Sequence, residues 1–315
     1  MSPNQKATVG TTAPDARPEA ARATPSPPRD KGVHPRNSLN DLSGRQWLRF
    51  TRSWDVWDSK RYHQNRNTEL HPARYPEEMV REFVQFFTKA GEWVLDPFAG
   101  SGATLVACSE LGRSAVGVEV SPKYAHLARS RLAQLALGSE RHVIEGDARS
   151  ALAPEFWGAL SAANIEHEDG LPLFDFVMTS PPYWNMLRTS RGGVKSTHKE
   201  RAEQGLDTHY SDSDLDLGNV ADYDQFVEAI GGVFDGLHPL LRQRRYLVCV
   251  VQNLRAPEGE VKPLAWDLCR RLSQTYLFQG EKIWCQNTKK LGIWGYPTTF
   301  VPNYHHHYCL IFRKV

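Results

Sequence analysis

The sequence has few cysteines, little net charge and no long apolar run. Its five cysteines form no CxxC pair and lie mostly in apolar runs, so we expect small core residues in a reducing cytosol, without disulfides or a zinc site. A formal net charge of +2 is too small to indicate a nucleic-acid partner, although basic residues can still cluster on one face. No segment approaches the roughly 18 apolar residues of a membrane span, and the N-terminus lacks the apolar core of a signal peptide. We therefore expect a soluble, cytoplasmic protein.

The first 37 residues also lack leucine, isoleucine and every aromatic residue, while they contain seven prolines. Such a segment cannot bury enough apolar area to offset its ordering entropy, so we expect a disordered tail at 1–37. Its basic residues would contact phosphates only weakly. The remaining residues, 38–315, can bury one large α/β core.

The stretch WVLDPFAGSGATLVACSEL, residues 93–111, organises the rest of the chain. Residues 93–95 are typical of a buried parallel strand, which Asp96 and Pro97 end. Gly100 and Gly102 allow a tight turn and a close approach to a ligand, because neither has a Cβ. A helix from residue 103 to 111 follows. An ordinary packing unit would account for a lone G-x-G, but not for the wider string DPFAGSGAT.

That string resembles the S-adenosylmethionine-binding motif of the amino-methyltransferases, which methylate exocyclic amino groups of DNA bases. The resemblance implies cofactor-binding roles for Asp96, Phe98, Ala99, Gly100, Gly102 and Thr104. HPARYP, residues 71–76, resembles the upstream cofactor motif of the family, which adds His71 and Pro72 as cofactor-binding residues. Tyr75 departs from that motif, in which many relatives carry Lys or Phe.

A second apolar strand, SAVGVEVSP, ends in an acidic residue, Glu119, about 20 residues after the glycine turn. One carboxylate can accept from both hydroxyls of a ribose, as in any βαβ nucleotide site. A dinucleotide cofactor would need the full G-x-G-x-x-G, but Leu105 occupies the third glycine position. The resemblance extends the cofactor site to Glu119, Val120, Asp147 and Ala148. In relatives the residue matching Asp147 accepts from the adenine amino group, and a plain surface turn is the alternative.

The string FDFVMTSPPYW is a buried strand, 174–178, followed by a rigid proline turn at the carboxyl end of a parallel sheet, where ligands bind. A nucleobase amino nitrogen is a poor nucleophile, and hydrogen-bond acceptors on its two N–H groups would draw it toward tetrahedral geometry. The Ser180 hydroxyl and the Pro181 carbonyl are such acceptors, and Tyr183, with Trp184 as the alternative, offers a ring on which an extruded base can stack. TSPPYW resembles the catalytic motif of the N4-cytosine methyltransferases, which implies a catalytic group of Ser180, Pro181, Pro182 and Tyr183. Some N6-adenine enzymes share this motif.

Three segments are candidates for DNA contact. The polar stretch 185–222 has a basic half that includes Arg188, Arg191 and Lys195, with a flexible lid as the alternative. Residues 287–304 carry Lys289 and Lys290. Residues 38–66 interleave aromatic and basic side chains, a pattern that fits nucleic-acid stacking but for which we favour packing on the core. Three consecutive histidines, 305–307, would alternate between faces of a strand, so we expect no metal site.

The periodicity predicts further helices at 124–137, 223–241 and 263–274, and seven strands in all. The resulting fold is α/β, a doubly wound Rossmann-like sheet whose last strand is antiparallel. The resemblance implies a DNA methyltransferase that forms N4-methylcytosine in duplex DNA with S-adenosylmethionine as cofactor. We expect a restriction-modification enzyme whose cognate endonuclease is a separate chain. The alternatives are an N6-adenine enzyme, an RNA methyltransferase, a protein-glutamine methyltransferase, which Ser180 disfavours, and a non-enzymatic DNA-binding module.

Overall fold

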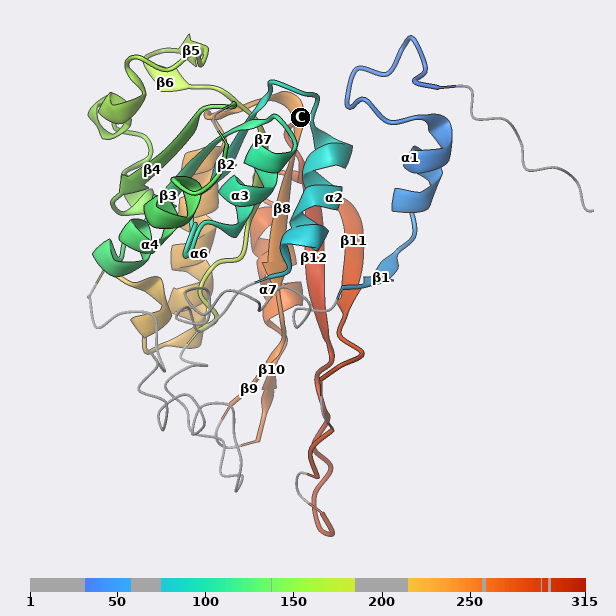
Figure 1. The fold of residues 1–315 in the computed structure, drawn as a ribbon. Coiled ribbons are helices and arrows are strands. Elements are labelled where there is room, and N and C mark those ends of the chain that lie inside the picture. The colour runs from blue at the N-terminus through green and yellow to red at the C-terminus, as the bar shows by residue number, and fades with distance from the viewer. Residues whose placement is uncertain are drawn as a thin grey trace, which may run out of the picture. The chain divides into compact units, whose positions relative to one another are not determined.

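Eight strands form one sheet in the order β1-β11-β12-β8-β7-β2-β3-β4 (Figure 1). Their bounds are β1 Trp54–Val56, β2 Trp93–Asp96, β3 Ser114–Glu119, β4 Arg141–Glu145, β7 Phe174–Thr179, β8 Leu241–Val251, β11 Leu277–Cys285 and β12 His306–Arg313. This computed structural model describes residues 32–57, 75–136, 138–184, 215–256, 259–289, 291–293 and 296–315. Two short hairpins lie outside the sheet, β5 His167–Glu168 with β6 Leu171–Pro172, and β9 Leu254–Arg255 with β10 Val261–Lys262.

The strand directions confirm the predicted doubly wound sheet. Strands β4, β3, β2, β7 and β8 pair in parallel, whereas β12 runs antiparallel to both of its neighbours, β8 and β11. The predicted number of strands in the sheet, seven, was wrong. β1 adds an eighth strand, because Trp54–Val56 pairs with Ile283–Cys285 of β11 in parallel. Three residues are too few to show a period, so only the distant partner makes this segment a strand.

Helices cover both faces of the sheet (Figure 1). Alternating residues of each strand point to opposite faces, so that Val94 packs in one apolar cluster and Leu95 in the other. The first cluster includes helices α2 Glu77–Phe87 and α3 Ala103–Glu110, and α4 Pro122–Leu132 reaches it through Leu132. The second includes α6 Tyr223–Leu237 and α7 Leu264–Leu272. The apolar faces of α2 and α6 are buried in these clusters.

The predicted bounds of α4 and α6 were wrong. Helix α4 begins two residues earlier than predicted, because Pro122 is favourable in a first helical turn, and it ends at Leu132 rather than Leu137, which lies outside the described residues. Helix α6 ends at Leu237, and Leu241 opens β8 instead of closing the helix. Pro239 explains this end, since proline has no N–H to donate to the carbonyl of the preceding helical turn.

The segment before the sheet packs on α2, as we favoured from the sequence. Phe50, at the end of α1 Gly44–Phe50, stacks on Phe86 with ring centroids 4.0 Å apart, and Trp47 lies 4.8 Å from the same ring. Trp57 is buried. The described part of this segment therefore contributes to the core with its aromatic side chains.

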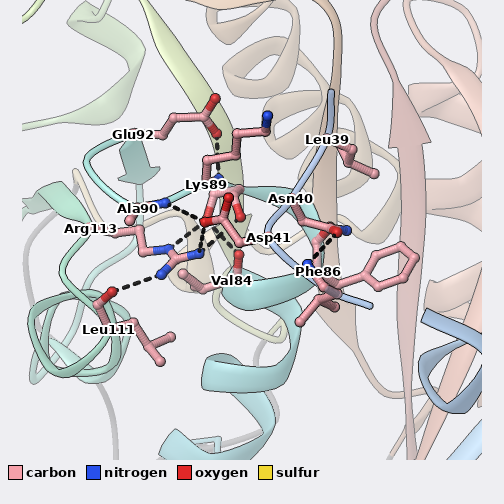
Figure 2. A network of polar contacts seen from close by, with 12 residues as sticks. Leu39, Asn40, Asp41, Val84, Phe86, Lys89, Ala90, Glu92, Leu111 and Arg113 are labelled. Carbon is pink, nitrogen blue, oxygen red and sulfur yellow. Dashed lines mark hydrogen bonds and ion pairs between the residues drawn. The ribbon is translucent and has the colours of Figure 1, made fainter. Parts of the chain in front are cut away.

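A polar network links the same segment to the end of α2 and to the residues that precede β2 and β3 (Figure 2). The Asn40 amide donates to the Phe86 carbonyl at 2.6 Å, and the backbone N–H of Ala90 donates to Asp41 at 3.0 Å. Arg113, which is nearly buried, donates to both oxygens of Thr88 and lies 3.6 Å from Asp41. Such buried polar groups are stable only when paired, so the network holds one defined arrangement.

The cysteines behave as small core residues where they are buried. Cys108, Cys249 and Cys309 are fully enclosed, and burial raises their thiol pKa values above the ordinary range. Cys269 and Cys285 are partly exposed. Across the described ranges, no helix is both long and apolar enough to cross a bilayer.

Candidate active site

The predicted site residues follow directly on the carboxyl ends of parallel strands. β2 ends at Asp96, β3 at Glu119, β4 at Glu145 and β7 at Thr179. Because these strands pair in parallel, their carboxyl ends meet at one edge of the sheet. The glycine turn after β2 and the SPPY turn, residues 180–183 after β7, are therefore neighbours.

The glycine turn has the conformation that its residues allow. Gly100 and Gly102 have φ values of +52° and +79°, in the left-handed region that other residues rarely adopt. Gly102 is the N-cap of α3, and its N–H donates to the Ala99 carbonyl at 2.8 Å. A Cβ on Gly102 would lie 3.1 Å from the Cβ of Ala128 in α4. The turn thus needs glycine for its backbone and for its packing.

Asp96 is enclosed by the protein rather than open to a ligand. Only 1% of its surface is exposed, and its carboxylate accepts four hydrogen bonds. The donors are the Thr104 hydroxyl at 2.5 Å, the Thr179 hydroxyl at 2.6 Å, the Tyr75 hydroxyl at 2.9 Å and the Phe98 N–H at 3.1 Å. Burial raises the pKa of Asp96 more than these four hydrogen bonds lower it. Phe98 itself is half-buried.

Tyr75 is a site residue whose side-chain role the sequence did not reveal. Its hydroxyl contacts both Asp96 and Thr104. Burial raises the pKa of Tyr75, and the charge of Asp96 raises it further. The only signal in the sequence was its departure from the Lys or Phe of the related motif, which showed that this position differs without showing how.

Glu119 joins the glycine turn to the next strand. Its Oε2 accepts from the N–H of Gly100 at 2.8 Å, and its Oε1 accepts from the N–H of Ser121 at 2.8 Å. Burial raises the pKa of Glu119 to about 7, against the two hydrogen bonds that lower it. Val120, which follows, is half-buried. Each carboxylate oxygen keeps a lone pair beyond the bonds it already accepts.

Asp147 is engaged with its own turn. It accepts from the Arg149 N–H at 2.9 Å and pairs with the Arg149 guanidinium at 2.5 Å. The carboxylate is half-buried, and the neighbouring Ala148 is buried at the start of a 3-10 turn, η3 Ala148–Ser150. This local pairing is what the alternative of a plain turn predicts, and a role toward a cofactor stays a prediction.

Ser180 and Tyr183 converge on one carbonyl of the neighbouring strand. The Ser180 hydroxyl lies 3.0 Å from the Val250 carbonyl and 3.1 Å from the Tyr183 hydroxyl, which is itself 3.4 Å from Val250. Pro181 is buried and Pro182 half-buried. The ring of Tyr183 is only 6% exposed, so its face is packed inside the protein. Trp184 is half-buried and donates to the Val220 carbonyl at 2.9 Å.

Behind Tyr183 lies a buried histidine that the sequence did not mark as functional. The His307 ring is 6.2 Å from the Tyr183 ring and stacks on Trp284 at 4.2 Å. Burial lowers the pKa of His307 to about 3, so the ring is neutral near pH 7. His306, next to it on β12, is in contact with Tyr308 instead, which confirms that adjacent histidines face opposite ways. Among the described residues, no group of three or more His, Cys, Asp or Glu could hold a metal ion.

Several predicted contacts lie outside the described residues, namely His71, Pro72, Arg188, Arg191, Lys195 and Lys290. Lys289 is described, and its Nζ donates to the Tyr304 carbonyl at 2.7 Å across the connection between β11 and β12. That connection projects beyond the sheet (Figure 1). It carries the strongly exposed apolar side chains Leu291, Ile293, Tyr296 and Phe300.

The family model described as DNA methylase, for N6 and N4 methyltransferases, matches residues 32–130. Over this segment, about a third of the chain, the protein is similar to the amino-methyltransferase family. It contains the glycine turn, Asp96 and Glu119, and it ends within α4.

Individual relatives agree with this family. The chain is 46% identical over 72 residues to the type II methyltransferase M.SmaI of Serratia marcescens, which is 22% of this chain and 25% of the relative. It is 34% identical over 79 residues to M.HpaI of Haemophilus parainfluenzae, 25% of each chain. The chain therefore spans about a quarter of the length of these curated relatives.

The comparison with solved structures found TrmN from Thermus thermophilus, with a TM-score of 0.42 and 14% identity, over 76% of this chain and 48% of that one. A SAM-dependent methyltransferase from Methanosarcina mazei has a TM-score of 0.42 and 12% identity, over 77% of this chain and 98% of that one.

Proposed function

We propose that this chain is an S-adenosylmethionine-dependent DNA methyltransferase that methylates the N4 amino group of cytosine in duplex DNA. The observation that carries the proposal is the hydrogen bond from Thr179 to Asp96, which brings the SPPY turn against the glycine turn. A methyl donor on one turn and an amino group at the other would thus be neighbours. The family match and the type II methyltransferase relatives support the reaction class.

The residues at the sheet edge fit the cofactor. Gly100 and Gly102 have positive φ values, so a tight turn without side chains at these positions lies at the sheet edge. Glu119 keeps one lone pair on each oxygen, enough to accept from two ribose hydroxyls while it still holds Gly100 and Ser121. Phe98 and Val120 are half-buried side chains beside these polar groups. When bound, S-adenosylmethionine supplies a methyl group that its positively charged sulfur makes electrophilic.

Ser180 is suited to accept a hydrogen bond from the substrate. A hydroxyl has one hydrogen, and the Val250 carbonyl at 3.0 Å takes it, which leaves the Ser180 oxygen as an acceptor. The Pro181 carbonyl is the second acceptor for the amino group. Together they favour the more tetrahedral nitrogen of the transition state over the planar ground state. Serine in this motif is the feature that favours cytosine N4 over adenine N6.

The stacking surface for an extruded base needs revision. The sequence suggested the Tyr183 ring, with Trp184 as the alternative, but the Tyr183 ring is packed inside the protein. We assign to Tyr183 a role through its hydroxyl beside Ser180, and to the half-buried Trp184 the aromatic face toward the base. The β11–β12 connection, with Lys289 and its exposed apolar side chains, is the described segment that we propose to contact DNA.

Mass spectrometry of digested DNA from cells that express the protein tests the assignment. We expect N4-methylcytosine at one short sequence, and its loss with Ser180→Ala. N6-methyladenine as the sole modified base would make the cytosine assignment wrong, and methylated RNA beside unmodified DNA would make the substrate class wrong. Modification of one sequence would also fit a restriction-modification system with its endonuclease on a separate chain.

A further inference from the structure

The carboxylate of Asp96 connects four separate parts of the chain. Its Oδ2 accepts from Tyr75, before α2, and from Thr104, in the first turn of α3. Its Oδ1 accepts from the Phe98 N–H in the glycine turn and from Thr179 at the end of β7. The two oxygens therefore bind different elements. Oδ2 accepts from residues near the starts of α2 and α3, and Oδ1 accepts from the glycine turn and from the last residue of β7.

These contacts are enclosed. Asp96 is 1% exposed and both threonines are fully buried, so water does not compete for the carboxylate. Hydrogen bonds to a charged acceptor in such surroundings are stronger and shorter than neutral ones, and three of the four here measure 2.5 to 2.9 Å. A carboxylate that already accepts four protein donors has no lone pair left for a cofactor.

Thr179 immediately precedes Ser180, so the hydrogen bond from Thr179 to Asp96 also restrains the backbone of Ser180. Ser180 is held from one side by the Val250 carbonyl of β8. From the other side its backbone is held through Thr179 by Asp96, and Asp96 also holds the glycine turn through Phe98. The distance between the two turns thus depends on one carboxylate.

We propose that Asp96 is a junction that keeps the cofactor turn and the SPPY turn in register, with Thr179 and Tyr75 as positioning residues. The inference rests on the proposed function, because register matters only if a group passes between the two turns. Methyl transfer needs the attacking nitrogen close to and in line with the methyl carbon, and a displacement of about 1 Å can lower the rate 100-fold. Thr179 acts on the side of the methyl acceptor, the substrate amino group. Tyr75 acts on the side of the methyl donor, the cofactor.

Thr179→Val tests the acceptor side, because valine keeps the shape of threonine and removes its hydroxyl. We expect kcat for DNA methylation to fall about 10- to 100-fold, while the calorimetric Kd for S-adenosylmethionine changes less than about twofold. Thr179→Ser restores a hydroxyl and should recover most of the turnover. The matched control is Thr275→Val, which removes a threonine-to-aspartate hydrogen bond, to Asp235, far from this edge and should leave kcat unchanged.

Tyr75→Phe tests the donor side, because it removes one hydroxyl and keeps the ring. Asp96 then loses one of the two donors to its Oδ2, and we expect the Kd for the cofactor to rise about 2- to 10-fold, as for one lost hydrogen bond. The melting temperature of each variant, measured in parallel, shows whether the fold has changed.

The outcomes separate the two claims. Full turnover in Thr179→Val would overturn the junction, and so would equal losses of kcat, cofactor affinity and melting temperature without rescue by Thr179→Ser. A wild-type protein that binds the cofactor but methylates no DNA would instead overturn the proposed function. In that case the Kd of Tyr75→Phe decides the donor side: an unchanged value overturns it, and a weakened one supports it.

Discussion

The N–H of Gly100 donates a hydrogen bond of 2.8 Å to Oε2 of Glu119, so the glycine turn after β2 is fastened to the end of β3. Glu119 lies at the boundary of the protein interior, only 9% exposed. Its pKa rises to about 7 because burial penalises the charge and because Asp96 and Asp216 repel it. The carboxylate that we assign to a ribose therefore titrates near neutral pH.

This pKa predicts how stability changes with pH. The ordinary value is 4.5 and the folded value about 7, so the folded state binds the proton more tightly. Between these values the Glu119 contribution to the free energy of unfolding falls as pH rises. Glu119→Gln should remove this decline in urea unfolding curves from pH 4.5 to 7.5. Glu155→Gln, at an exposed position, should keep the decline. If Glu119→Gln showed the same decline with pH as the wild type, the raised pKa of Glu119 would be contradicted.

His307 should act in the opposite direction at lower pH. Its folded pKa of about 3 lies below the ordinary 6.5, because burial disfavours the charged ring and Lys289 and His306 add repulsion. The unfolded state then binds more protons, so this contribution is complete above pH 6.5 and is lost as pH falls toward 3. His307→Phe keeps a ring against Trp284 and cannot be protonated. We expect its unfolding midpoint to fall less than that of the wild type between pH 6 and 4.

A control for His307→Phe is measured over the same pH range. His126 is exposed, and His126→Phe should follow the wild-type acid profile. If His307→Phe lost stability in acid as steeply as both of these proteins, the acid sensitivity would arise from other groups.

Gly102→Ala should weaken both the fold and the cofactor site. An L-residue at φ +79° costs about 1 to 2 kcal/mol, and the new Cβ would meet Ala128 at 3.1 Å. We expect that loss in the free energy of unfolding and a weaker calorimetric Kd for S-adenosylmethionine. Gly158→Ala is the matched control, since a Cβ there meets nothing within 4 Å and the residue has no positive φ. Equal stabilities of the two variants would contradict the strain argument.

Much of the sheet edge could be predicted from the sequence, because the strand ends and turns there depend on residues that are close together in the chain. Glycines at 100 and 102 predicted a turn, and both have positive φ. Apolar runs that end in Asp96 and Glu119 predicted strands with carboxylates at their ends, and these strands are parallel neighbours. The SPPY turn follows the next parallel strand in the same way.

The rest depends on partners that lie far apart in the chain. β1 exists only because β11 is beside it, and nothing within three residues indicates that pairing. Tyr75 and Thr179 meet Asp96 from segments on either side of it, so a carboxylate that suggested a cofactor contact is filled by protein donors instead. The burial of Tyr183 likewise follows from the neighbouring strands β8 and β12, and a proline-aromatic motif alone does not show it.

The last prediction separates the two hydroxyls of the SPPY turn. Ser180→Ala removes the side-chain acceptor that we assign to the substrate amino group, and loss of one preorganised polar partner typically costs about 100-fold or more in turnover. Tyr183→Phe removes the neighbouring hydroxyl but keeps the buried ring, so turnover should fall less and stability should change little.

Tyr183→Ala would be a poor test of that chemistry, because emptying a site that is 6% exposed should cost about 3 to 5 kcal/mol of stability. Single-turnover methylation with saturating cofactor, measured beside urea unfolding, distinguishes these effects. If Tyr183→Phe lost as much turnover as Ser180→Ala at wild-type stability, the acceptor role would belong to the pair of hydroxyls. If Ser180→Ala kept full turnover, the Pro181 carbonyl would have to polarise the amino group without Ser180, and the serine would no longer support cytosine as the target.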